Sequence, residues 1–123
     1  MHLVCRQCSS RLSSDLQPVS LSERNETMGE EFLHRGTVMQ EDGSYFQGRT
    51  GEYIVHSEDV VHVQLTSDSK RLAGCCGLDG CDGPNLQCEI CETYVATKIT
   101  DCWRPHCVVF ESATTRLVSE VNS

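Results

Sequence analysis

The sequence predicts a single small domain over residues 1–123, built mostly from short antiparallel β-strands with little helix. Two observations lead to this prediction. From residue 32 onward, segments rich in β-branched and aromatic residues alternate with the turn signals EDGS, GRTG and TSDSK. Two Cys-x-x-Cys turns bracket these segments. We expect the core to extend over about 4–112 and the weakly patterned residues 113–123 to form a frayed tail.

The individual elements follow from local patterns. A short strand is expected over residues 1–4, and a short helix over 22–31, with Ser22 as its N-cap and Glu23 in its first turn. Asp42-Gly43 is a strong hairpin signal. We expect about six to eight strands in all. Apart from the first, they are expected within FLHRGTVMQ, SYFQG, EYIVH, VVHVQL, NLQCEICETYVATKITD and HCVVFES.

Charge and composition exclude several classes of function. Ten basic and eighteen acidic residues give a net charge of −8, which disfavours binding to nucleic-acid phosphates. No apolar run reaches the roughly 18 residues that suggest a membrane-spanning helix. The first ten residues lack a basic segment followed by a long apolar stretch, so we expect no signal peptide. Nine cysteines in such a chain indicate a reducing compartment, and we therefore expect the cytoplasm.

The cysteine pattern favours metal binding over disulfides. Nine is an odd number, so complete pairing within one chain is impossible. The segments VCRQCSSRL and QCEICETYV match in frame, each with an apolar residue four positions after its second cysteine. Two intervening residues let one tight turn direct two thiolates at one ion, while backbone N–H groups donate to the sulfurs. Two such turns supply the four soft ligands that tetrahedral Zn²⁺ prefers, so we expect one structural zinc ion on Cys5, Cys8, Cys88 and Cys91.

This arrangement resembles the β-tent family, which includes Yippee-like proteins, methionine-R-sulfoxide reductases and the ligand-binding domain of cereblon. In Yippee-like proteins a Phe-Gln-Gly-x-x-Gly segment and apolar strands follow the first Cys-x-x-Cys, and YFQGRTGEYIV stands in that place here. The resemblance covers residues 4 to about 110 and implies a β-tent-like fold. The GCCGLDGCDGPN segment is not part of the Yippee pattern, so the resemblance does not assign a function.

Five further cysteines and one histidine leave three interpretations open. They could hold a second metal ion, since the surrounding glycines would let the loop fold tightly around it. One of them could be a reactive thiol, or they could be small buried residues in a glycine-rich turn. The residues concerned are Cys75, Cys76, Cys81, Cys102, His106 and Cys107.

In the sulfoxide reductases of the β-tent family, the nucleophile lies downstream of the second Cys-x-x-Cys in an Arg-Tyr-Cys segment. Cys107 has a similar place but follows Arg104-Pro105-His106, which departs from that motif. Trp103, the single tryptophan, is a candidate for lining a ligand pocket, although a core position is the commoner role. One tryptophan cannot build the multi-tryptophan cage of cereblon.

The sequence therefore favours a non-catalytic binding module for a protein or small molecule, contacted near Trp103 and the glycine-rich loop. The alternative is a thiol-based redox enzyme or sensor that uses Cys107, Cys102 or Cys76. The reactivity of the thiols toward an alkylating reagent discriminates between these two functions.

Overall fold

The computed structural model describes residues 1–20, 24–46, 48–72, 77–81, 83–101 and 104–119. The described part is mostly β, as the sequence predicts, and its only helical element is a single 3₁₀ turn, η2 (Ser69–Arg71). Its nine strands are β1 (His2–Cys5), β2 (Gln17–Pro18), β3 (Thr37–Gln40), β4 (Tyr53–Val55), β5 (Val63–Leu65), β6 (Leu86–Cys88), β7 (Tyr94–Ile99), β8 (Cys107–Phe110) and β9 (Thr115–Val118).

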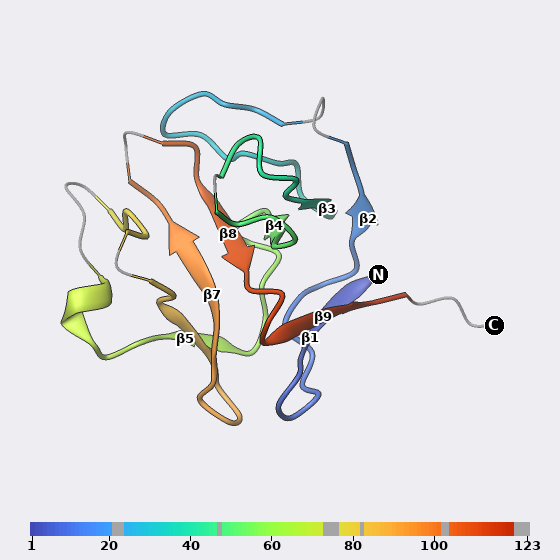
Figure 1. The fold of residues 1–123 in the computed structure, drawn as a ribbon, viewed down its shortest axis with the longest axis vertical. Helices are drawn as coiled ribbons and strands as arrows, with labels where there is room; N and C mark the ends of the chain where they lie inside the picture. The colour runs from blue at the N-terminus through green and yellow to red at the C-terminus, as the bar shows by residue number, and fades with distance from the viewer. Residues whose placement is uncertain (21–23, 47, 73–76, 82, 102–103, 120–123) are drawn as a thin grey trace.

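The strands form two sheets. Seven of them make one sheet in the order β2-β3-β4-β8-β7-β6-β5, and β1 pairs with β9 in a separate two-stranded sheet (Figure 1). All neighbours are antiparallel except β2 and β3, which are parallel. Sequence-distant strands such as β4 and β8 are therefore neighbours at the centre of the large sheet.

Strand β8, at the centre of the large sheet, is buried on both faces. All four of its residues are buried, and successive side chains point to opposite faces. Val108 and Phe110 belong to one apolar cluster, and Cys107 and Val109 belong to a second. The first cluster also contains Leu3, Cys5, Leu12, Leu16, Val38, Val55, Leu86, Cys88, Val95 and Ala96. The second also contains Phe32, Leu33, Met39, Phe46, Ile54 and Ile99.

The C-terminal part of the chain differs from the expected frayed tail. Residues 115–118 form β9, which pairs with β1 along its whole length, from Cys5 opposite Thr115 to His2 opposite Val118. The local pattern of this segment is weak because only some of its side chains are buried, so its order comes from pairing with β1.

The helix that the sequence predicts over 22–31 is absent from the described part of that segment. The backbone instead pairs with the chain before β8. The carbonyl of Glu30 accepts from the N–H of His106 (2.7 Å), and Phe32 N–H donates to the carbonyl of His106 (2.9 Å). These hydrogen bonds to a distant segment replace those that a helix would make within itself.

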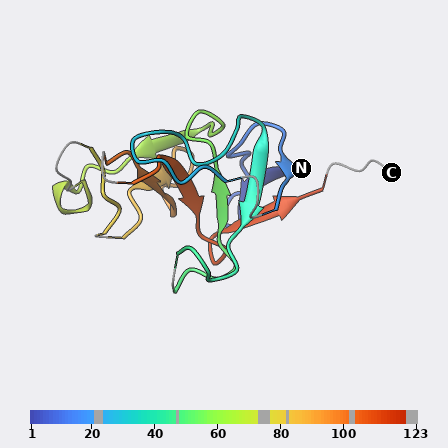
Figure 2. The same cartoon turned by 90° about the horizontal axis from the view of Figure 1, so that it is seen from above.

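The Asp42-Gly43 signal does not produce a two-residue hairpin. Strand β3 pairs with β4 across a longer connection, which projects from the sheet in Figure 2, and SYFQG is not a strand in its described residues. Glu41 organises this loop: its Oε2 accepts from the backbone N–H groups of Gly43, Tyr45 and Phe46, each at 2.9 Å. A buried carboxylate with three donors is a strong local constraint, which the hairpin pattern does not anticipate.

In the described part of the chain, no helix is both long and apolar enough to cross a lipid bilayer.

Candidate metal centre and adjoining cleft

The structure brings together the four cysteines of the two Cys-x-x-Cys turns. Cys5 is the last residue of β1, and Cys88 is the last residue of β6. The four Sγ atoms lie within 4.8 Å of one another, with Cys5–Cys91 at 3.6 Å and Cys8–Cys88 at 3.5 Å. Four sulfurs about 2.3 Å from one tetrahedral ion would be about 3.8 Å apart, so the set is placed to hold a metal ion.

The two turns have the same backbone geometry, and we call them knuckle 1 (residues 5–10) and knuckle 2 (residues 88–93). Ser9 N–H donates to the carbonyl of Cys5, and Glu92 N–H donates to that of Cys88, both at 2.8 Å. Both donors are in the left-handed region, each with φ of 65°. A non-glycine residue in that region carries strain, which the closed turn holds in place in both knuckles.

Hydrogen bonds to the sulfurs also match between the knuckles. The sulfur of Cys5 accepts from backbone N–H groups of its own turn, as the sequence predicts, and so does the sulfur of Cys88. In addition, Ser10 Oγ lies 3.1 Å from Cys8 Sγ, and Thr93 Oγ1 lies 3.2 Å from Cys91 Sγ. Sequence reasoning did not identify these hydroxyls, although each occupies the second position after its Cys-x-x-Cys in the two matching segments.

The four thiols differ in acidity. Burial raises the pKa of Cys5 to about 12 and also raises the pKa of Cys88. The hydrogen bond with Thr93 lowers the pKa of Cys91 to about 6, and the hydrogen bond with Ser10 lowers that of Cys8. A metal ion on all four sulfurs must therefore displace protons from the two buried thiols, because the ligand is the thiolate.

The residues proposed for a second metal site do not form one within the described part. Among these residues, no second set of three or more His, Cys, Asp or Glu donor atoms converges. Cys81 is exposed and Cys107 is buried at the start of β8. His106, also described, contributes its backbone to the pairing with Glu30 and Phe32. Cys75, Cys76, Cys102 and Trp103 lie outside the described residues.

The described glycines of the cysteine-rich loop have a packing role. A Cβ atom on Gly77 would lie 2.2 Å from the carbonyl oxygen of Thr100, and one on Gly80 would lie 2.9 Å from Thr97 Cγ2. The loop is also hydrogen-bonded to the residue that follows β7, since Leu78 N–H donates to Thr100 Oγ1 (2.9 Å). The glycines at 77 and 80 therefore allow the loop to lie directly against β7.

Cys107 is poorly suited to act as a nucleophile. It is 1% exposed, and burial raises its pKa to about 12. The reactive form of cysteine is the thiolate, which such a site does not provide near neutral pH. Of the three cysteines considered for thiol chemistry, Cys102 and Cys76 lie outside the described residues.

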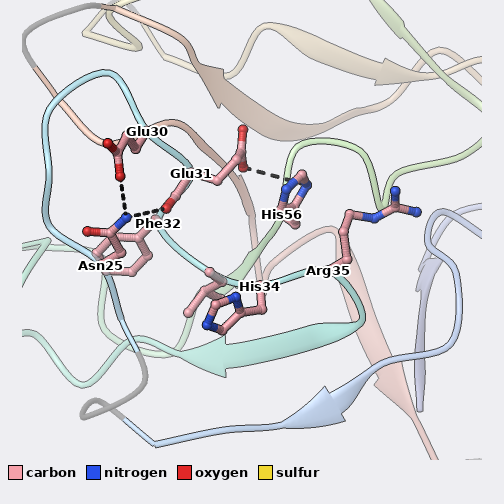
Figure 3. Close-up of a pocket in the computed structure, with 8 residues that line it drawn as sticks. Asn25, Glu30, Glu31, Phe32, His34, Arg35 and His56 are labelled. Carbon is pink, nitrogen blue, oxygen red and sulfur yellow. Dashed lines mark hydrogen bonds and ion pairs between the residues drawn. The ribbon is translucent and has the colours of Figure 1, made fainter.

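A cleft of about 360 Å³ lies where the 24–36 segment meets the end of β4 (Figure 3). The sequence does not predict this cleft, because the 24–36 segment and His56 are distant in the sequence and meet only in the folded chain. The cleft is lined by Asn25, Glu30, Glu31, Phe32, Leu33, His34, Arg35 and His56.

Two carboxylates of the cleft are held in place. Glu31 Oε1 accepts from Ser57 N–H (3.0 Å), and its Oε2 is hydrogen-bonded to the Ser57 hydroxyl. Glu30 Oε1 accepts from Asn25 Nδ2 at 3.1 Å, as the left part of Figure 3 shows. All of these donors are uncharged, so none of them offsets the charge of a carboxylate.

His56 presents a hydrogen-bond donor. Its Nδ1 accepts from the backbone N–H of Glu58 (3.0 Å), which assigns the hydrogen of the neutral ring to Nε2. Glu31 Oε1 lies 3.7 Å from the same Nδ1, too far for a hydrogen bond. The neutral ring can therefore donate only through Nε2.

The positive charge of Arg35 is already compensated. Its Nε donates to Asp59 Oδ1 (2.8 Å), and its Nη1 lies 3.2 Å from Glu58 Oε1. Asp59 is 2% exposed and also accepts from Gly36 N–H (2.6 Å). Hydrogen bonding with Asp59 raises the pKa of Arg35. In Figure 3 this side chain extends away from the other side chains of the cleft.

Comparisons with protein-family models, with curated proteins and with solved structures find no match for this chain. The resemblance to the β-tent family therefore stays an expectation from the sequence.

Proposed function

We propose that this chain is a non-catalytic binding module whose fold is held together by one structural Zn²⁺ ion. The observation that carries the proposal is the convergence of four cysteine sulfurs within 4.8 Å, contributed by two matching knuckles. Four sulfur ligands fill a tetrahedral shell and leave no position for substrate, which is typical of structural rather than catalytic zinc.

Zinc is the ion that this donor set favours. Tetrahedral sites with four thiolates are typical of zinc and of iron–sulfur centres, and Zn²⁺ has no redox chemistry, which suits a purely structural site. The thiols of such a site must remain reduced, which supports a reducing compartment such as the cytoplasm. The meeting of two knuckles in a mostly β domain also supports our proposal that the chain is β-tent-like.

Binding rather than thiol chemistry is supported by two further features. Cys107 is buried with its pKa raised to about 12, which argues against a thiol enzyme or sensor that uses this residue. The cleft beside His56 has a volume near the lower end of the range of about 300–1,000 Å³ that is usual for small-molecule sites. We place the contact surface of the module at this cleft.

Elemental analysis of the purified full chain tests the metal proposal. We expect one zinc per chain, with loss of zinc in Cys8→Ser and Cys91→Ser. The matched control is Cys81→Ser, since Cys81 is exposed and lies outside the cluster of four sulfurs. Iron in place of zinc, or unchanged zinc content in Cys8→Ser and Cys91→Ser, would contradict the proposal. A second zinc ion per chain would indicate a further metal site, for which the cysteines of the glycine-rich loop are candidates.

Alkylation of the zinc-loaded protein, followed by mass spectrometry, tests the non-catalytic role. We expect the exposed Cys81 to be modified at the rate of an ordinary thiol and Cys107 to remain unmodified. A cysteine that reacts much faster than an unfolded control peptide would favour the thiol-based function instead.

A further inference from the structure

The cleft carries an uncompensated negative charge. Of its three side chains that carry a full charge, Arg35 is engaged by the buried Asp59, whereas Glu30 is bound only by the uncharged Asn25. Glu31 is bound by the uncharged Ser57, and its one basic neighbour is His56, whose Nδ1 lies 3.7 Å away and accepts from the backbone of Glu58. The chain as a whole has a net charge of −8, so no distant excess of positive charge offsets this potential. An anionic ligand is therefore disfavoured.

A metal ion is also disfavoured in this cleft. Its imidazole and carboxylate groups do not form a set of three or more converging donor atoms, in contrast to the four sulfurs of the metal centre. Glu31 is already oriented by Ser57, and His56 directs its Nδ1 lone pair to the backbone of Glu58. Besides the Nε2–H donor of His56, the groups that remain for a ligand are separate carboxylate acceptors, which suit a ligand with several N–H donors.

We infer that the cleft binds an organic cation, a primary ammonium or guanidinium group, through the carboxylates of Glu30 and Glu31. These two carboxylates are held by Asn25 and Ser57 before a ligand arrives, which lowers the ordering cost of binding. The ligand is a free amine or a lysine or arginine side chain of a partner. This inference names the ligand class for the proposed binding function and rests on it.

Isothermal titration calorimetry with the zinc-loaded full chain tests the inference with three ligands of equal chain length. Putrescine is a butane chain with an amine at each end, butanediol is its neutral counterpart and succinate its anionic counterpart. We expect putrescine to bind with a Kd of about 1 mM or tighter, and the other two not to bind measurably. Equal or tighter binding of butanediol or succinate would overturn the inference.

Capped lysine and capped arginine distinguish the two sources of the cation. Tighter binding of a capped amino acid than of putrescine indicates a partner protein, and the reverse indicates a free amine. Absence of heat with all three cations would overturn the inference even if zinc is bound. Loss of zinc from the wild-type chain would instead count against the structural role proposed for the metal, so the two failures are distinguishable.

Substitutions locate the cation within the cleft. Glu31→Gln and Glu30→Gln should each weaken putrescine binding about tenfold, the effect of one charge-assisted hydrogen bond. Glu26→Gln is the matched control: it removes the same charge from the same segment, but Glu26 does not line the cleft. Equal weakening in this control would show a non-specific charge effect and overturn the inference.

Glu31 also binds Ser57, so its variant needs a separate check of folding. Zinc content and the emission of the single tryptophan provide that check. Glu30 is exposed, and its substitution keeps the inference falsifiable if Glu31→Gln does not fold. Unchanged putrescine binding in a folded Glu30→Gln protein would exclude that carboxylate from the site.

Discussion

Ser10 and Thr93 occupy the same position in the two knuckles, beside the cysteines whose pKa values are lowered. A thiolate has no proton to donate, so in each sulfur–hydroxyl contact the hydroxyl is the hydrogen-bond donor when the cysteine is ionised. Such donors disperse the negative charge of the cysteine sulfur and orient it toward the metal. This is the usual effect of groups that hydrogen-bond to a metal ligand. Ser10 and Thr93 should therefore help the chain to retain its metal.

Ser10→Ala combined with Thr93→Val should accelerate zinc transfer to a chromophoric chelator by about 10-fold or more, because both outer hydrogen bonds are lost. The exchanged variant, Ser10→Thr with Thr93→Ser, keeps both hydroxyls and should behave like the wild type. Equal transfer rates for the hydroxyl-free and the exchanged variants would contradict a role for these groups.

Acidification should weaken metal binding in a predictable direction. The raised pKa values of Cys5 and Cys88 mean that both thiols keep their protons through neutral pH, and zinc must displace them. Zinc affinity should therefore rise by at least about 100-fold per pH unit near pH 7, since at least the two protons of Cys5 and Cys88 leave for each ion bound. Below the pKa of Cys91, about 6, this thiol is protonated too and the dependence should become steeper. Competition with a chelator across this pH range measures how zinc affinity changes with pH. An affinity that does not change with pH would contradict the conclusion that zinc displaces protons from Cys5 and Cys88.

The left-handed backbone conformation of Glu92 leads to a prediction about stability that depends on the backbone and not on a side-chain contact. Glu92→Val places a β-branched residue at φ of 65° and should destabilise the folded chain by about 1–2 kcal/mol. Glu92→Gly removes the strain and should be neutral or stabilising. Denaturant unfolding at saturating zinc compares the two variants, and equal midpoints would contradict the strain argument.

Among the connecting elements, the 41–52 loop depends on a single carboxylate. Glu41 is 1% exposed and binds three backbone N–H groups through Oε2, while Oε1 is buried without a hydrogen-bond partner in the described part of the chain. The loop places Tyr45 and Phe46 on Phe32, with ring centroids 4.8 and 6.3 Å from that of Phe32. Glu41 therefore indirectly supports the 24–36 segment that forms the cleft.

Glu41→Ala should lower the free energy of unfolding by about 3 kcal/mol, because three backbone donors, one buried and two partly buried, lose a charged acceptor. Glu41→Gln keeps one carbonyl acceptor and should cost less. Glu26→Ala, an exposed substitution in the segment packed beside this loop, should change stability by no more than about 0.5 kcal/mol. Denaturant unfolding at fixed zinc concentration tests the series, and a Glu41→Ala effect as small as that of Glu26→Ala would contradict this role.

The elements that the sequence predicts correctly are those whose signals are local. YVATKI and CVVF are β-branched and apolar, and they form β7 and β8. The in-frame match between the two Cys-x-x-Cys segments anticipates the meeting of four sulfurs, since one ion can satisfy both turns only if they converge. In each of these cases the residues that make the pattern also make the contact.

The predictions that differ from the structure concern segments whose partners are distant. The predicted 22–31 helix is absent from residues 24–31, which bond to His106 instead, and 115–118 becomes a strand beside β1. The Asp42-Gly43 turn signal yields to the buried carboxylate of Glu41. The cleft combines Glu31 with His56, whose proximity follows from the path of the chain and not from any local pattern.

Across the whole molecule, the pairing of β1 with β9 has a topological consequence. Because the pair is antiparallel, with His2 opposite Val118, the chain enters and leaves the domain at adjacent points, as Figure 1 also shows. A unit with such neighbouring entry and exit points can be grafted into a surface loop of a carrier protein without stretching the carrier's backbone. The same adjacency allows a short linker to join the two ends, so that a circular permutant opened in the projecting 41–52 loop would keep both knuckles.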